Sequence, residues 1–207
     1  MRNYFKISIY LYVMIHCCLA SADSYVDFFR AVNVDNARTV SQLLAQGFDP
    51  NTVSESGQVA LYLAMRDDAP KVAEVLLASP TLKIDSANPV GETPLMMAAL
   101  HGRLDWTRRL LAQGAKVQRP GWSPLHYAAA GPSTEVVALL LSQGAEVNAR
   151  APNGNTPLMM AARYGAEDNV KLLLQRGADK RLLNDLNQSA ADMARTAERP
   201  WLLRSLQ

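Results

Sequence analysis

Cysteine is nearly missing from this chain of 207 residues, and both copies, Cys17 and Cys18, lie within the first 22 residues. The remainder therefore has no thiol that forms a disulfide or acts as a nucleophile, which excludes a disulfide-stabilised scaffold and a cysteine-dependent enzyme. Apolar residues make up 49% and charged residues 19% of the sequence. This is an ordinary globular balance, and it excludes a disordered chain.

The sequence also lacks an excess of one charge sign. It has 21 basic and 19 acidic residues, but Arg2 and Lys6 lie in the first 22 residues, so the remainder holds 19 of each sign. Nucleic-acid binding depends on clustered cations that release counterions, so we expect no nucleic-acid partner. Residues 23–115 have 8 basic and 11 acidic side chains, and residues 116–207 have 11 and 8. This polarity is consistent with orienting a partner, with antiparallel self-pairing or with solvated charge of no function.

The first 22 residues have the pattern of a secretory signal peptide. After the two cations, residues 7–19 are mostly apolar, and Ala20 and Ala22 are small residues at the positions that signal peptidase recognises. The apolar run is shorter than the roughly 20 residues that span a bilayer. We therefore predict cleavage between Ala22 and Asp23, with an uncleaved amino-terminal anchor as the alternative. A secreted domain without cysteine favours the bacterial periplasm.

One segment recurs along the rest of the chain. The pattern Thr/Ser-Pro-Leu-x-x-Ala-Ala begins at Thr93, Ser123 and Thr156, and seventeen residues after each start a Leu-Leu pair leads into a turn with glycine. Weaker copies begin near residues 26, 59 and 189, so that successive starts are 33, 34, 30, 33 and 33 residues apart. A fixed period of this length is typical of solenoid architectures.

Each copy predicts a pair of short helices. The hydroxyl and the proline at its start favour the first turn of a helix, and a second apolar helix ends at a glycine suited to a left-handed cap, at Gly47, Gly114, Gly144 and Gly177. Segments between copies, such as residues 149–155, are rich in Gly, Pro and Asn and predict protruding turns. Helices shorter than about 12 to 15 residues are marginal alone, so the pairs must stack on one another.

The Thr-Pro-Leu-His-type starts, the Leu-Leu-x-x-Gly stops and the segment from Gly144 to Ala149 resemble the ankyrin repeats. The resemblance implies an all-α ankyrin-repeat solenoid over residues 23–207, with about five helix pairs, a short carboxyl-terminal capping pair and β-turn fingers between units. It further implies a concave face that binds other proteins, and a structural role for His126 in bridging backbone groups between units.

The interval of 30 residues marks a shortened connection between Val117 and Ser123. Trp122 lies at the base of this stunted finger, beside the expected groove. An indole at such a place is suited to anchoring a partner. The alternative is that Trp122 fills the space that the missing residues leave.

Catalytic motifs are absent from the sequence. No His-Glu-x-x-His, phosphate-binding glycine loop or serine elbow occurs, and His101 and His126 occupy different positions in their units. We therefore predict no catalytic, cofactor or metal site, and hence no enzyme. His101 is a candidate partner contact, while Met96, Met97, Met159 and Met160 are expected to fill the core and groove, with adaptable recognition or oxidant capture as alternatives.

We predict a monomeric, non-enzymatic scaffold that binds a protein partner through its concave finger and helix face. The alternatives are a protection or stability factor for a periplasmic enzyme, an exported effector and, least favoured, a small hydrolase. The partner-binding candidates lie where fingers or the ends of first helices project, and arginine and aromatic residues lead because they tend to carry interface energy. They are Arg66, Asp67, Leu100, His101, Trp122, Asn153, Arg163 and Tyr164.

Overall fold

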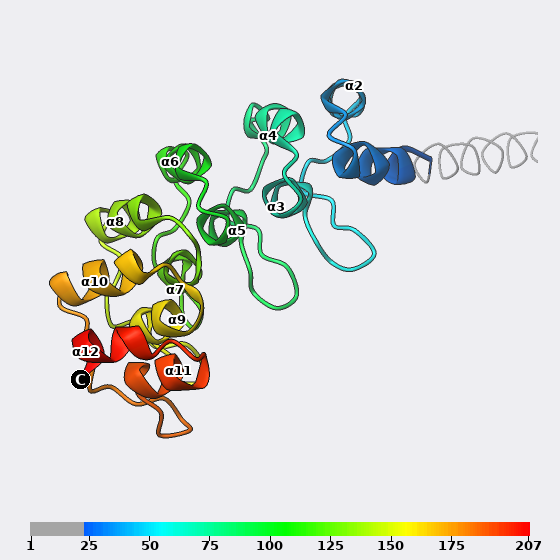
Figure 1. Ribbon diagram of the computed structural model, residues 1–207. Coiled ribbons are helices and arrows are strands. Elements are labelled where there is room, and N and C mark those ends of the chain that lie inside the picture. Colours follow the sequence, from blue (N-terminus) through cyan, green and yellow to red (C-terminus); the bar gives the residue numbers. More distant parts are fainter. Residues whose placement is uncertain (1–22) are drawn as a thin grey trace, which may run out of the picture. The chain divides into compact units, whose positions relative to one another are not determined.

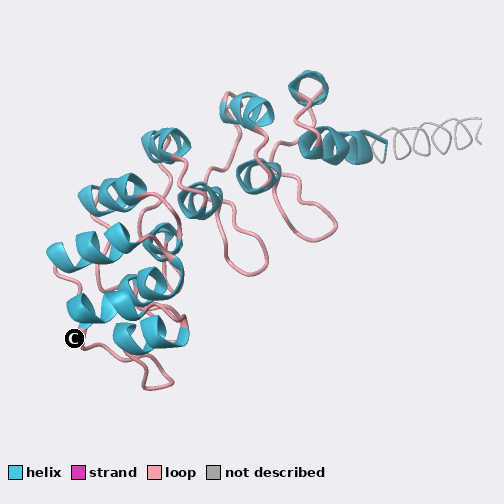
Figure 2. Ribbon diagram, in the orientation of Figure 1, coloured by secondary structure: helices cyan, strands magenta, loops and turns pink. Residues whose placement is uncertain are grey.

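The computed structural model describes residues 23–207, and the signal peptide predicted over residues 1–22 lies outside this range. The described chain consists of short helices joined by loops (Figure 2). Within residues 23–207 the only β-pairing is one isolated bridge, between Val53 and Val59. The prediction of an all-α solenoid of helix pairs is confirmed. The chain forms two compact units, which divide between Leu82 and Lys83.

The first unit, over its described residues 23–82, contains two helix pairs. Residues 23–33 are helical and precede α2 (Ala37–Ala45), and α3 (Ala60–Arg66) precedes α4 (Pro70–Leu77). Helix α4 packs against both α2 and α3. The described part of the first helix includes Val26, near which the first weak copy of the repeat is predicted to start.

The second unit, residues 83–207, stacks its helices in two rows (Figure 1). The first helices of the repeats pack on one another in the order α5 (Pro94–Leu100), α7 (Pro124–Ala130), α9 (Pro157–Tyr164) and α11 (Ala190–Thr196). The second helices form the other row, with α6 (Leu104–Ala112), α8 (Thr134–Ser142) and α10 (Glu167–Gln175). The 3-10 helix η1 (Pro200–Leu202) and α12 (Leu203–Leu206) pack beside α11.

The hydroxyl residues at the repeat starts cap the first helices. Thr93 accepts a hydrogen bond from the backbone N–H of Met96, and Thr156 and Ser189 do the same for the residue three positions on. Each bond satisfies a backbone donor that has no partner inside the helix. After the second helices the chain turns through glycines with φ between +87° and +91°, a conformation that glycine adopts without steric penalty, at Gly47, Gly114, Gly144 and Gly177.

Four of the connections between repeats close as the same hydrogen-bonded turn. The backbone N–H of one residue donates to the carbonyl four positions on, at distances of 2.8 to 3.0 Å, in Ser54–Gln58, Asn88–Glu92, Ala151–Asn155 and Asn184–Gln188. The shortened connection differs, because residues 120–122 form a bend instead of a hydrogen-bonded turn. The shortened connection therefore lacks the closed turn that the other four share.

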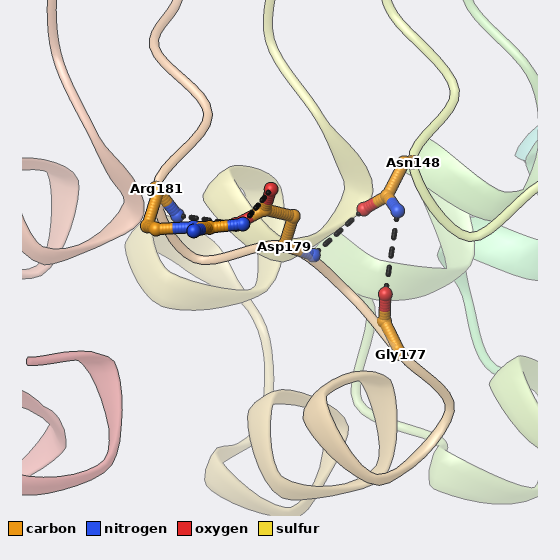
Figure 3. A network of polar contacts seen from close by, with 4 residues as sticks. All are labelled: Asn148, Gly177, Asp179 and Arg181. Carbon is orange, nitrogen blue, oxygen red and sulfur yellow. Dashed lines mark hydrogen bonds and ion pairs between the residues drawn. The ribbon is translucent and has the colours of Figure 1, made fainter.

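Polar contacts also join successive repeats at the turns that follow the second helices (Figure 3). The Asn148 side chain donates to the carbonyl of Gly177 at 3.3 Å and accepts from the backbone N–H of Asp179 at 2.9 Å. Arg181 binds both carboxylate oxygens of Asp179, and this contact holds the pKa of Asp179 below its ordinary range. The hydrogen bonds of Asn148 thus tie the turn after α8 to the turn after α10.

The ends of the first helices approach one another closely. A Cβ atom built on Gly165 would lie 1.9 Å from the carbonyl oxygen of Ala129 and 3.0 Å from the Cα of Ala161. The φ angle of Gly165 is −81°, which any residue adopts, so glycine is required here by space alone. The absence of a side chain at this position lets α9 and α7 pack at backbone distance.

Asn169 on α10 supplies hydrogen bonds to the end of α7. Its side-chain nitrogen donates to the carbonyls of Ala128, Ala129 and Gly131 at 3.4, 3.2 and 2.9 Å. Its oxygen accepts from the Thr134 hydroxyl at 2.9 Å. Asn169 is fully buried. It adds a donor to carbonyls at the end of the helix, of which Ala128 and Gly131 also accept from the backbone N–H groups of Gly131 and Ala166.

Candidate functional site

A pocket of about 380 Å³ opens on the face formed by the first helices of the second unit. We call this the first-helix pocket. It is lined by the side chain of Trp122 from the shortened connection and by side chains of α5, α7 and α9. The lining residues are Leu100, Trp122, His126, Tyr127, Ala130, Met160 and Tyr164. The volume lies near the lower end of the range of small-molecule sites, about 300 to 1,000 Å³.

Trp122 forms one wall of the pocket. Its ring packs edge-on against His126 with centroids 5.3 Å apart and against Tyr127 with centroids 6.4 Å apart. Trp122 remains partly exposed. Trp122 thus packs on His126 and also lines the pocket, and its role as an anchor for a partner stays a prediction.

His126 is buried and bridges two repeats. Its Nε2 lies 3.1 Å from the carbonyl oxygen of Asn155, and its Nδ1 accepts from the backbone N–H of Ser123 at 3.2 Å. Because a carbonyl only accepts and an N–H only donates, the ring is neutral with its proton on Nε2. Burial lowers the pKa of His126 below its ordinary value, and the bond to Asn155 opposes that shift without cancelling it.

We expect His126 to make the fold less stable in mild acid. Because its pKa is lowered by folding, the unfolded chain binds the proton more readily, so stability is full above the ordinary histidine pKa of about 6.5 and falls as the pH drops below it. One proton changes the free energy of unfolding by at most about 1.4 kcal/mol per pH unit. Urea unfolding between about pH 7.5 and pH 5 should show that the free energy of unfolding falls as the pH is lowered. This pH dependence should be weaker in His126→Gln and unchanged in His101→Gln. An equal slope in all three proteins would contradict this role.

The charges beside the pocket differ from one side to the other. Toward α5, the Tyr127 hydroxyl donates to the carboxylate of Glu92 at 2.9 Å. Toward α11, the guanidinium of Arg163 lies 5.2 Å from the ring centroid of Tyr164 and contacts the sulfur of Met193 at 3.8 Å. Within residues 23–207, no carboxylate pairs with Arg163. The carboxylate on one side of the pocket thus has a hydrogen-bond donor in Tyr127, whereas the cation on the other side, Arg163, contacts Tyr164 and Met193 without a carboxylate partner.

The structure brings part of the predicted partner-binding set together. Leu100, Trp122 and Tyr164 line the first-helix pocket, and Arg163 lies beside it. His101 is the exposed cap that follows α5.

The other predicted residues lie apart from the pocket lining. Asn153 is exposed on a finger, where its side chain accepts from the backbone N–H of Asn155. Arg66 and Asp67 belong to the first unit, where the guanidinium binds both carboxylate oxygens at 2.6 Å and also Gln58 at 2.8 Å. The opposite charges of Arg66 and Asp67 are thus paired with each other.

Four lining residues were not among the predicted contacts: His126, Tyr127, Ala130 and Met160. Their positions within the repeats identify three of them, Tyr127, Ala130 and Met160. Tyr127 and Met160 each lie four residues after a repeat start, and Leu100 and Ala130 each lie seven residues after one. Positions four and seven in a first helix lie on the same side. Following these two positions through the repeats would have outlined the pocket.

From residue 23 onward, no three metal-binding side chains of the His, Cys, Asp or Glu type come together at one point. None of the helices in this range combines the length and the hydrophobicity that crossing a bilayer requires.

Comparison of the sequence with known proteins identifies one family. The profile described as ankyrin repeats (3 copies) matches residues 28–120 and 115–184. The chain belongs to the ankyrin-repeat family, as its motifs predicted, and ankyrin repeats mediate protein–protein interactions.

Several curated proteins are similar in sequence. The B-cell lymphoma 3 protein homolog of Mus musculus is 32% identical over 164 residues, which cover 76% of this chain and 37% of that protein. Neurogenic locus notch homolog protein 4 of Homo sapiens is 47% identical over 93 residues, or 43% of this chain and 5% of that protein. Protein glp-1 of Caenorhabditis elegans is 27% identical over 180 residues, or 79% of this chain and 14% of that protein. The chain thus spans a minor part of the length of each.

Proposed function

We propose that this protein is a non-enzymatic scaffold that binds one protein partner through the first-helix face of its second unit. The observation that carries the proposal is the apolar first-helix pocket, which presents Trp122, Tyr127 and Tyr164 beside Arg163. Aromatic and arginine side chains around a pocket are the features that most often supply interface energy. Membership of the ankyrin-repeat family supports a protein as the ligand.

Capture of the partner from producing cells tests this function. Cells that make the tagged full chain are treated with a crosslinker, and the captured proteins are identified by mass spectrometry. We expect one protein to be enriched with the wild type and lost with the triple variant Trp122→Ala, Arg163→Ala, Tyr164→Ala. A matched triple variant on second-helix surfaces, Gln143→Ala, Lys171→Ala, Arg176→Ala, should retain it. If the partner were lost only with the matched triple variant, the binding site would lie on the second-helix face.

We also propose that binding takes place in the periplasm, after the segment before Asp23 is removed. The support is the cation-plus-apolar pattern of residues 1–22. Cell fractionation with amino-terminal sequencing tests it, and the expected result is a periplasmic protein that begins at Asp23. An intact amino terminus in the membrane fraction would indicate the uncleaved anchor instead.

A further inference from the structure

The first-helix pocket combines an apolar interior with a cation at one edge. Its wall residues Leu100, Trp122 and Met160 offer no charge, while Tyr164 carries the Arg163 guanidinium over its ring. Burying apolar side chains of a partner there removes hydrophobic surface from water. A partner group that also reaches Arg163 gains a charge-assisted contact.

Arg163 is unlike the arginine at the same repeat position in the first unit. Arg66 and Arg163 both lie seven residues after a repeat start. The residue after Arg66 is Asp67, which neutralises it through two hydrogen bonds of 2.6 Å. The residue after Arg163 is Tyr164, which offers a ring face and no carboxylate. The positive charge at the pocket is therefore available to a ligand.

The wider charge distribution favours the same sign of ligand. Residues 116–207, which provide most of the pocket, hold 11 basic and 8 acidic side chains. On the α5 side, Tyr127 already engages the carboxylate of Glu92. A second acidic group placed on that side would meet a like charge, whereas on the α11 side it would meet Arg163.

We propose that the first-helix pocket receives a large apolar side chain from an extended segment of the partner, and that an aspartate or glutamate next to that side chain pairs with Arg163. The occupant is thus an acidic, apolar-anchored peptide segment, which lies with its acidic residue toward α11. The inference rests on the proposed function and specifies the chemistry of the partner. It also assigns Arg163 the role of selecting the sign of charge beside the anchor.

Selection from a random peptide library tests the proposal without knowledge of the partner. Phage-displayed peptides of twelve residues are selected on the purified full chain, and the enriched sequences are synthesised. We expect Leu, Met, Phe or Trp beside Asp or Glu. Arg163→Glu should weaken binding of such a peptide by at least about tenfold, whereas Arg176→Glu, an equal charge change on an exposed residue after α10, should leave it within about twofold.

Two variants probe the pocket itself. Ala130→Leu fills it, and Tyr164→Ala removes an exposed wall residue that is not part of the core. Both variants should bind the peptide more weakly than the wild type does. The Tyr164 variant remains informative if the Ala130 variant does not fold. A peptide with lysine in place of its acidic residue should no longer bind the wild-type protein but should bind the Arg163→Glu variant.

The contrary outcomes are distinct. Failure to enrich any peptide, enrichment of basic flanks, or equal binding by Arg163→Glu and Arg176→Glu would overturn the inference. If the cell still yields a partner that the Trp122, Arg163, Tyr164 triple variant loses, the proposed function stands and the partner presents a folded surface instead of a segment. If that capture also fails, the proposed function itself is wrong.

Discussion

Replacing Gly165 with alanine is expected to lower the free energy of unfolding by about 3 kcal/mol or more. The added Cβ would meet the Ala129 carbonyl oxygen at 1.9 Å and the Ala129 carbonyl carbon at 3.1 Å. These are backbone atoms at the end of α7, so no side-chain rotation relieves the contact and α9 has to move away. Guanidinium unfolding of the full chain measures the loss.

Gly144→Ala is the matched control, because it separates space from backbone conformation. Gly144 has φ +88° and no heavy atom within 4 Å of a built Cβ. Alanine there is strained only by its left-handed backbone, which costs about 1 to 2 kcal/mol. Gly165→Ala should therefore be the more damaging change. If it unfolds at the same denaturant concentration as the wild type, α7 and α9 do not pack at backbone distance.

Asn169→Asp is expected to destabilise the fold by about 3 to 5 kcal/mol at neutral pH, the magnitude typical of an uncompensated buried charge. The substitution leaves the shape nearly unchanged, but it places a carboxylate where the amide nitrogen now donates to Ala128, Ala129 and Gly131. Donors become acceptors that face carbonyl oxygens in a site without solvent exposure. Thermal unfolding near pH 7 measures the effect.

Acid should partly relieve this variant, because a protonated carboxyl regains one donor and loses its charge. Asn153→Asp serves as the control, since Asn153 is exposed and its side-chain oxygen already acts as an acceptor. That variant should lie within about 0.5 kcal/mol of the wild type. Equal melting of the two aspartate variants would contradict the capping role of Asn169.

The helix boundaries could be predicted from the sequence because their causes are local. A hydroxyl before proline and a glycine after a leucine pair act within four residues, and the structure has caps at Thr93 and Thr156 and left-handed turns at Gly114 and Gly144. The first helix, which lacks a Thr-Pro start, could be located only by repeat offset.

The pocket could be predicted only in part, because it is assembled from three repeats. Trp122 was found through the shortened interval, and Leu100 and Tyr164 through their place at helix ends. Tyr127 and Met160 were missed because each resembles ordinary core filler in its own repeat. The pairing of Arg66 with Asp67 could not be predicted either, since it depends on side-chain geometry that the sequence does not specify.

Site-specific photocrosslinking tests most directly whether the first-helix face is the recognition surface. A benzophenone amino acid is placed at Tyr164, an exposed residue of the pocket, or at Gln175, an exposed residue of α10. The cells are then irradiated and the adducts identified by mass spectrometry. The account predicts one adduct of defined mass from position 164 and none from position 175. The same adduct from position 175, with none from position 164, would contradict it.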